Sequence, residues 1–548
     1  MNSNNEIIEK FIQLFDNNKN ELIEWIKAKN EDGDSVLHLA AKFNYVEVIK
    51  KLNPLFDKNE NELFIDSNMK NWTFNSIDKE SIEWIEFKRA TSIFDSEFDD
   101  SEDELFVDSS MKNWTFNSID NESIESFKYE NEDGDSVLHL AARKNVAIIE
   151  RLIPLFDNNK KELIEWVKDK NQNGNSVLHI SAEFKNVEII ERLIPLFDNN
   201  KNKLIKWIKD KNQDGNSVLH LAAYYNIVEI FKRLILLFDN SKNELIEWIK
   251  DKNQDGNSVL HISAEFKNVE TIEILISLFD DNKNKLIEWI KDKNQDGSSV
   301  LHISAYYNFV EIIEILIPLF DNNKNELIEW IKDKKEDGNS VLHIAGWKNS
   351  YEIIQRLIPL FDNNKNELIE WIKNKNQDGN SVLHLAAQYK SVETIERLIP
   401  LFDNNKNELI EWIKDKNQDG NSVLHLAALY KSDETIERLI PLFDNNKNEL
   451  IEWIKNKNIC GDSVLHIAVK NNSIEIIEKL IPLFDNNKNE LIELIKDKNQ
   501  DGYSVLHLAK KKNNIDMIEK LILLFDNNKN ELIELTTSNN ELNCCCLL

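Results

Sequence analysis

Short blocks of apolar residues at helical spacing alternate with polar turns along the chain. The stretch 297–337 shows the pattern: a short helix is predicted over 300–305, between a candidate N-cap at Ser299 and a candidate left-handed C-cap at Asn308. A second apolar stripe runs from 310 to 320 at the spacing of an amphipathic helix. The pattern therefore predicts two helices joined by a tight connection.

A third helix is predicted directly after these two. Asn323 and Glu326 stand at capping-box spacing, and the apolar residues of 327–331 continue at helical spacing. The eight prolines occupy one shared position near the end of the second stripe: Pro54, Pro154, Pro195, Pro318, Pro359, Pro400, Pro441 and Pro482. Because proline lacks the N–H that a helix needs, it must either kink the second helix there or start a new one, and we expect the kink, since Leu236 and Ser277 stand at the same position without other change.

The tripeptide Val-Leu-His shows that this unit is repeated. Its histidines are His38, His139, His179, His220, His261, His302, His343, His384, His425, His466 and His507, which are all the histidines of the chain. From His179 onward they are 41 residues apart. A fixed period between about 20 and 50 residues indicates stacked repeats. The predicted fold is therefore all-α, an elongated helical-repeat solenoid of helix-turn-helix units with a short extra helix in each unit.

The repeats divide the chain into four segments. Residues 1–57 hold a partial unit and the first repeat, residues 129–535 hold ten tandem repeats, and residues 536–548 form a tail. Between them, residues 58–128 lack Val-Leu-His and carry an acidic stretch and an internal duplication. We expect this duplicated acidic insertion to be partly disordered.

The repeat resembles the ankyrin repeat. The segment Asp-Gly-Asn-Ser-Val-Leu-His-Leu-Ala-Ala at 378–387, followed by an Ile- and Leu-rich segment at 392–399, is similar to the opening and the second helix of that family's unit. The period of 41 differs from the family's value of about 33, and Val replaces the proline that starts the family's first helix. A HEAT-like α-solenoid, with a period of about 40–47, is the alternative architecture.

Charge and composition narrow the possible partners. The 548 residues contain 67 basic and 97 acidic side chains, a net charge of −30, which disfavours nucleic acids and anionic lipids and favours basic protein partners. No apolar run reaches the roughly 18 residues of a membrane span, and the start of the chain lacks the pattern of a secretory signal. We therefore expect a cytoplasmic protein, and we expect it to be a monomer. Four cysteines exclude a disulfide framework.

Candidate sites for catalysis and metal binding are weak. Packed helices lie about 8–10 Å apart, so histidines of neighbouring repeats cannot share a zinc ion, whose bonds to nitrogen are about 2.0–2.1 Å. The histidines are instead predicted to bond backbone groups near the turns. The Asp321-x-Asn323-x-Asn325 pattern lacks the glycine and the final glutamate of a calcium loop. No catalytic constellation stands out, so we expect no enzyme activity, no metal and no cofactor.

Aromatic residues gather four and five positions after the histidines: Phe43, Phe184, Tyr224, Tyr225, Phe266, Tyr306, Tyr307, Trp347, Tyr389 and Tyr430. The resemblance implies that these positions face the concave side of the array. Exposed aromatic residues are typical anchors for protein partners, so they are our candidate partner-binding residues. The alternative is that their rings pack between neighbouring repeats.

The final residues, Cys545-Cys546-Leu547-Leu548, match a prenylation box. One lipid holds a protein only weakly, so a second lipid on Cys544 would complete an anchor at the cytosolic face of a membrane. The alternative is an unmodified tail.

Together these features predict a non-catalytic scaffold that binds protein partners on the concave face of the array. A regulatory or substrate-targeting subunit of an enzyme complex is the alternative. A prenylated ankyrin array also resembles effectors that intracellular bacteria deliver into eukaryotic hosts.

Overall fold

The computed structural model describes most of the repeats. It covers residues 28–29, 34–35, 38, 130–144, 146–156, 160–197, 200–238, 241–279, 282–321, 323–361, 364–403, 405–444, 446–485, 487–512, 517–518 and 520–521. The insertion at 58–128 and the tail at 536–548 lie outside the described residues, as does most of 1–57. The chain forms two compact units, residues 1–254 and residues 255–548, and each is described by itself.

The described residues form 28 α-helices in a repeating set of three, and three isolated bridges but no strand. The first helices are α7 (Val137–Lys144), α10 (Val177–Glu183), α13 (Val218–Tyr224), α16 (Val259–Glu265), α19 (Val300–Tyr307), α22 (Val341–Lys348), α25 (Val382–Tyr389), α28 (Val423–Tyr430), α31 (Val464–Lys470) and α34 (Val505–Lys511). The second helices are α8 (Val146–Leu155), α11 (Val187–Leu193), α14 (Val228–Ile235), α17 (Val269–Ser277), α20 (Val310–Leu316), α23 (Tyr351–Leu357), α26 (Val392–Leu398), α29 (Asp433–Leu439) and α32 (Ile474–Leu480). The third helices are α9 (Lys160–Lys168), α12 (Lys201–Ile208), α15 (Lys242–Lys250), α18 (Lys283–Ile290), α21 (Lys324–Lys332), α24 (Lys365–Lys373), α27 (Lys406–Lys414), α30 (Lys447–Lys455) and α33 (Lys488–Lys496).

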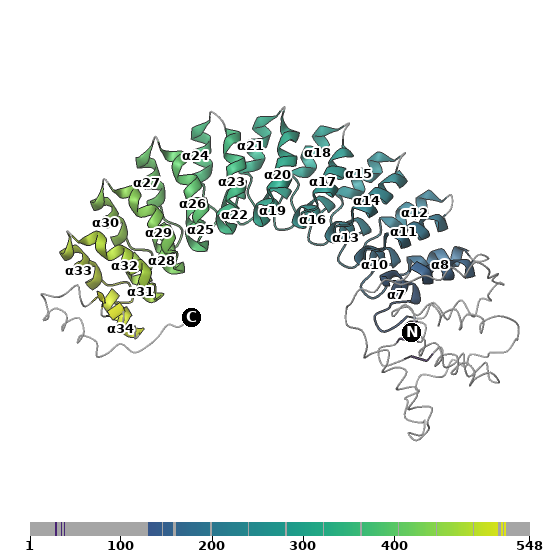
Figure 1. Cartoon of the computed structure of the whole chain (residues 1–548), viewed down its shortest axis with the longest axis horizontal. Helices are drawn as coiled ribbons and strands as arrows, with labels where there is room; N and C mark the ends of the chain where they lie inside the picture. Colours follow the sequence, from purple (N-terminus) through teal and green to yellow (C-terminus); the bar gives the residue numbers. More distant parts are fainter. Residues whose placement is uncertain are drawn as a thin grey trace, which may run out of the picture. The chain divides into compact units, whose positions relative to one another are not determined.

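Equivalent helices lie side by side within each unit. In the second unit the repeats follow one another in chain order along a curved row, with the first helices on its inner side and the third helices on its outer side (Figure 1). The first helices contact one another in sequence, α16 with α19, α19 with α22 and α22 with α25. The all-helical repeat fold and the extra helix predicted from the sequence are confirmed.

The first helix begins and ends as its sequence predicts. Ser299 is the N-cap of α19, and Asn308 ends it in the left-handed conformation with φ of 57°. Lys390 and Lys431 take the same conformation after α25 and α28.

The proline position does not kink an α-helix in most repeats. In seven repeats the α-helix is followed directly by a 3₁₀-helix: η3 (Ile194–Phe197), η4 (Leu236–Phe238), η5 (Ile317–Phe320), η6 (Ile358–Phe361), η7 (Ile399–Phe402), η8 (Ile440–Phe443) and η9 (Ile481–Phe484). Proline can occupy the first turn of this new helix because that turn leaves its N–H unbonded. Among the prolines of the described residues, only Pro154 lies within an α-helix.

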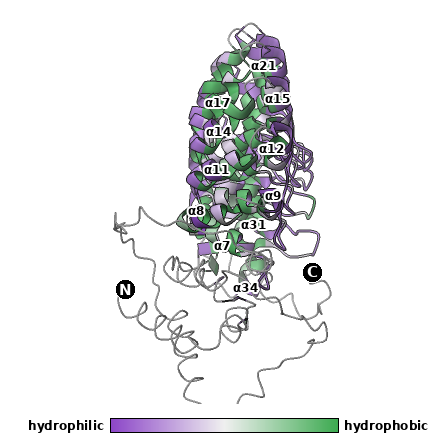
Figure 2. Ribbon diagram, turned by 90° about the vertical axis from the view of Figure 1, so that its right-hand side faces the viewer, coloured by the Kyte–Doolittle hydropathy of each residue, from purple (hydrophilic) through white to green (hydrophobic). Residues whose placement is uncertain are grey.

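The third helix covers an aromatic pair in every described repeat except the one that contains α33, where Leu494 replaces the tryptophan. Phe320 at the end of η5 stacks on Trp330 of α21, with ring centroids 5.2 Å apart, and both are almost fully buried. Equivalent Phe–Trp pairs recur from Phe156 and Trp166 to Phe443 and Trp453. Hydrophobic residues lie between the second and third helices, and hydrophilic residues lie along the outer flanks (Figure 2). The residues that lengthen the repeat to 41 therefore enlarge its core.

The turns between repeats also bond to one another. The Gln377 N–H donates to the carbonyl of Asp337 at 3.1 Å, and the Asn376 side-chain amide donates to Asn339 at 2.9 Å. Gly338 has φ of 78°, and a Cβ atom there would lie 2.8 Å from the nitrogen of Gln377. Glycine is therefore required both by the turn and by the close approach of the next repeat.

Candidate binding surface

The buried histidines link neighbouring repeats and are not part of the exposed surface. In one example, the Ser340 N–H donates to His343 Nδ1 at 3.3 Å, and His343 Nε2 lies 3.1 Å from the carbonyl oxygen of Asn380 in the next repeat. Because Nδ1 accepts a hydrogen bond from an N–H, we assign the ring proton to Nε2, which donates to the carbonyl. The histidines thus bond backbone groups, as the sequence predicts.

Burial keeps these imidazoles neutral. It lowers the pKa of His179, His302, His343, His384 and His425 to about 4. For His343 the charge of Lys334 lowers the pKa further. Within the described residues, no group of three or more His, Cys, Asp or Glu side chains is placed to hold a metal ion. These five histidines therefore act in packing, whereas the Nε2 atom of His507 has no hydrogen-bond partner among the described residues.

The candidate partner-binding residues lie at the C-terminal ends of the first helices. We call these helix ends, together with the turn residues that face them, the inner surface. Seven of its aromatic residues are 37 to 50% exposed: Phe184, Tyr224, Phe266, Tyr306, Tyr307, Tyr389 and Tyr430. Tyr225 and Trp347 are partly buried, and Phe43 lies outside the described residues. The inner surface thus presents aromatic rings to solvent in both units.

Three of these rings contact one another in a row in the second unit. The Tyr306 and Trp347 ring centroids are 5.4 Å apart in an edge-to-face arrangement, and those of Trp347 and Tyr389 are 5.7 Å apart. We include Tyr430, which follows Tyr389 in the next repeat, and we name these four residues the aromatic ladder. Tyr306, Trp347 and Tyr389 contact rings of neighbouring repeats and still remain partly exposed, so packing between repeats does not remove them from the surface, and their role in partner binding stays a prediction.

Polar side chains bridge neighbouring repeats beside the aromatic rings. The Tyr307 hydroxyl donates to Glu265 at 3.2 Å, and the Gln388 amide donates to the Tyr430 hydroxyl at 3.2 Å. Burial, the Glu265 charge and this hydrogen bond raise the pKa of Tyr307 to about 12. The tyrosine therefore remains a neutral hydrogen-bond donor at pH 7.

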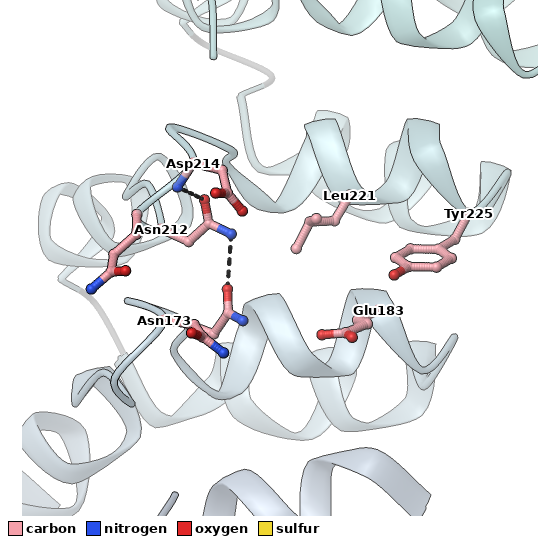
Figure 3. Close-up of a pocket in the computed structure, with 8 residues that line it drawn as sticks. Asn173, Glu183, Asn212, Asp214, Leu221 and Tyr225 are labelled. Carbon is pink, nitrogen blue, oxygen red and sulfur yellow. Dashed lines mark hydrogen bonds between the residues drawn. The ribbon is translucent and has the colours of Figure 1, made fainter. Parts of the chain in front are cut away.

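Polar residues of the turns and residues of the first helices also line a small hollow in the first unit (Figure 3). Its volume is about 200 Å³, and its walls carry Asn173, Asn175, Glu183, Asn212, Gln213, Asp214, Leu221 and Tyr225. Burial raises the pKa of Glu183, although the charge of Arg143 opposes the shift. Residues of the turns and of the first helices face this one hollow, which shows that both contribute to the inner surface.

Sequence reasoning missed the polar members of the inner surface. Glu183, Glu265, Gln388 and Lys348 occupy the same two positions as the aromatic residues, which was the available signal. Glu265 and Gln388 bond to tyrosines of the next repeat, 42 residues further along the chain. These contacts can be recognised only once the stacking of the repeats is known.

The two lipidation candidates, Cys544 and Cys545, lie outside the described residues, so their modification stays a prediction. Among the described helices, none combines the length and the apolar character needed to cross a lipid bilayer.

Comparison with known families agrees with this geometry. A family model described as "Ankyrin repeats (3 copies)" matches residues 115–203, 196–285, 281–367, 361–449 and 442–531. The chain belongs to the ankyrin-repeat family. The HEAT-like alternative is therefore set aside. Ankyrin repeats form protein–protein interaction domains and are typically non-catalytic. A comparison with curated proteins gives no match.

Membership of the ankyrin-repeat family explains the first two helices of each repeat and the turns that join neighbouring repeats. This ankyrin array differs by its third helix, whose tryptophan closes the core on the outer side. The inner surface is left as the face on which side chains vary from repeat to repeat.

Proposed function

We propose that the chain is a non-catalytic protein-interaction scaffold whose partners bind on the inner surface, chiefly on the aromatic ladder. One contrast carries the proposal. The tryptophans of the third helices, such as Trp330 and Trp371, are at most 2% exposed, whereas Trp347 lies among exposed tyrosines. The core thus buries its large rings, and the rings left accessible are grouped on one face. Grouped aromatic residues are typical of protein-binding hot spots.

The charge of the chain supports protein partners over nucleic acids. A net charge of −30 repels phosphate backbones, and ankyrin repeats suggest protein partners in general. The proposed scaffold needs no metal and no cofactor, and we place it in the cytoplasm as a monomer.

The proposal is tested by affinity capture with three forms of the full chain. The parent is compared with a variant in which Tyr306, Trp347, Tyr389 and Tyr430 are changed to alanine. A control variant changes Glu329, Glu370 and Glu411, which are exposed on the third helices, to alanine. We expect a set of proteins that the parent and the control retain and the ladder variant loses.

Retention of every partner by a correctly folded ladder variant would contradict the proposal. An enzyme captured in stoichiometric amount through the ladder would define the chain as a targeting subunit of that enzyme. Folding of each variant is checked by its urea unfolding midpoint.

Lipidation is a separate proposal, supported by the cysteine motif alone. We propose that Cys545 is prenylated and that Cys544 carries the second lipid. Membrane fractionation of the parent, Cys545→Ser and Cys544→Ser tests this: each variant is expected to shift to the unbound fraction. Equal partitioning of the parent and Cys545→Ser would overturn it.

A further inference from the structure

The aromatic ladder already holds one cation of its own chain. The Lys348 Nζ atom lies 3.8 Å from the ring centroid of Tyr306 and 4.4 Å from that of Trp347. Among the described residues Lys348 forms no ion pair with a carboxylate. An ammonium group within about 6 Å of a ring centroid is attracted to the electron-rich face of the ring. The ladder is therefore built so that a cation can lie on its rings.

The turns between repeats carry exposed acidic residues at a repeated position. Asp337, Asp378 and Asp419 occupy the turn position before each glycine and are exposed. The equivalent Asp214 lines the hollow of the first unit together with Tyr225, the residue directly after α13 (Figure 3). The same turn position in the second unit therefore supplies one exposed carboxylate per repeat.

The two observations together select a partner chemistry. We infer that the aromatic ladder binds an extended basic segment of a protein partner, whose arginine or lysine side chains lie on the rings while Asp337, Asp378 and Asp419 balance their charge. This inference rests on the proposed function and adds the class of partner. Lys348 then competes with the incoming cation. An acidic segment would gain from Lys348 but would face the row of aspartates.

The sign of the effect of Lys348 separates these two partner classes. Changing Lys348 to methionine removes the competing charge and keeps a side chain of similar length. A basic ligand should therefore bind more tightly to Lys348→Met, and an acidic ligand more weakly. Lys406→Met is the matched control, because it makes the same charge change at an exposed position on α27.

The test uses fluorescein-labelled 15-residue peptides with the full chain, followed by fluorescence anisotropy. The three peptides repeat Arg-Gly-Ser, Gln-Gly-Ser or Glu-Gly-Ser. We expect the arginine peptide alone to bind. We expect Lys348→Met to bind it roughly two to five times more tightly than Lys406→Met does, which corresponds to the usual strength of an exposed cation–π contact.

Loss of ring faces should have the opposite effect. Trp347→Ala and, as a second variant at a more exposed position, Tyr389→Ala should each weaken binding of the arginine peptide about fivefold or more, with no change in net charge. Binding that is insensitive to both ring variants would be unspecific attraction to an acidic protein and would overturn the inference. Weaker binding of the arginine peptide to Lys348→Met would also overturn it.

Failure of this inference is distinguishable from failure of the proposed function. If cellular partners need the ladder but none of them binds through a basic segment, the scaffold stands and the basic-segment inference is wrong. If no partner needs the ladder, both are wrong.

Discussion

The interior of each repeat and its inner surface differ in how much their residues vary. The interior repeats the same contacts, with a serine–histidine–carbonyl link and a phenylalanine–tryptophan pair in one repeat after another. The inner surface carries Tyr306, Trp347, Gln388 and Leu429 at one equivalent position. The contrast follows from position. Interior side chains must pack against and bond to the next repeat, whereas side chains at the helix ends face solvent and are free to differ. Stability and binding therefore belong to different side chains of the same short helix.

Acid should destabilise the interior through its buried histidines, and this is the largest effect we expect. The pKa of His302, His343, His384 and His425 is about 4 in the folded chain, below the value of about 6.5 in an unfolded chain. Between these values the unfolded chain binds protons that the folded chain does not. Stability is therefore unaffected by these groups above about pH 6.5 and falls as the pH drops toward 4, by about 3 kcal/mol for each histidine.

Urea unfolding midpoints at pH 7.5, 6.5 and 5.5 measure this loss. His343→Gln is the control, because it should be less stable at pH 7.5 but should lose less stability on acidification. A midpoint that stays level or rises from pH 6.5 to 5.5 would show that the histidines are not held neutral by the fold.

A single interior ring should have the next largest effect. Trp330→Ala removes a ring that is 2% exposed and stacked on Phe320, so we expect a loss of about 3–5 kcal/mol in the free energy of unfolding. Trp330→Phe should cost much less, because it keeps the stacking and removes a buried indole N–H that has no hydrogen-bond partner among the described residues. Urea unfolding compares the two variants, and equal losses would contradict this role of the ring.

The ion pairs between third helices should have the smallest effect. Lys332 Nζ lies 2.8 Å from Glu367 of the next repeat, and both side chains are about 30% exposed. Partly exposed pairs of this kind are screened by solvent and salt, so Lys332→Met should cost less than about 1 kcal/mol. The cost should shrink further in 1 M sodium chloride when followed by thermal unfolding. If Lys332→Met lowered the free energy of unfolding as much as Trp330→Ala does, the Lys332–Glu367 ion pair would contribute as strongly as a contact of the interior, which contradicts this expectation.

Much of the fold could be predicted because its signals are local and repeated. The cap at Ser299, the left-handed Asn308 and the third helix follow from residues within one unit. The proline position was predicted less well. The sequence excludes an ordinary helical hydrogen bond there, but it does not choose between a kink and a 3₁₀-helix, and the phenylalanine–tryptophan pair does not choose either, because it forms both after the α-helix that contains Pro154 and after the 3₁₀-helix η5.

The candidate surface was only partly predictable. Periodicity identified the aromatic positions, but the Tyr307–Glu265 hydrogen bond and the place of Lys348 over Tyr306 depend on the stacking of separate repeats. The spacing of residues along the chain does not tell which side chains of neighbouring repeats meet, because one repeat could pack against the next with its helices shifted by one turn.

The most direct test of the separation between interior and inner surface is hydrogen–deuterium exchange of the full chain with and without a captured partner. We predict slower exchange at the C-terminal ends of α19, α22, α25 and α28 and in the turns that face them, with unchanged exchange in α21, α24, α27 and α30. Protection confined to these third helices would contradict the account, since the partner would then bind on the face that the aromatic ladder does not reach.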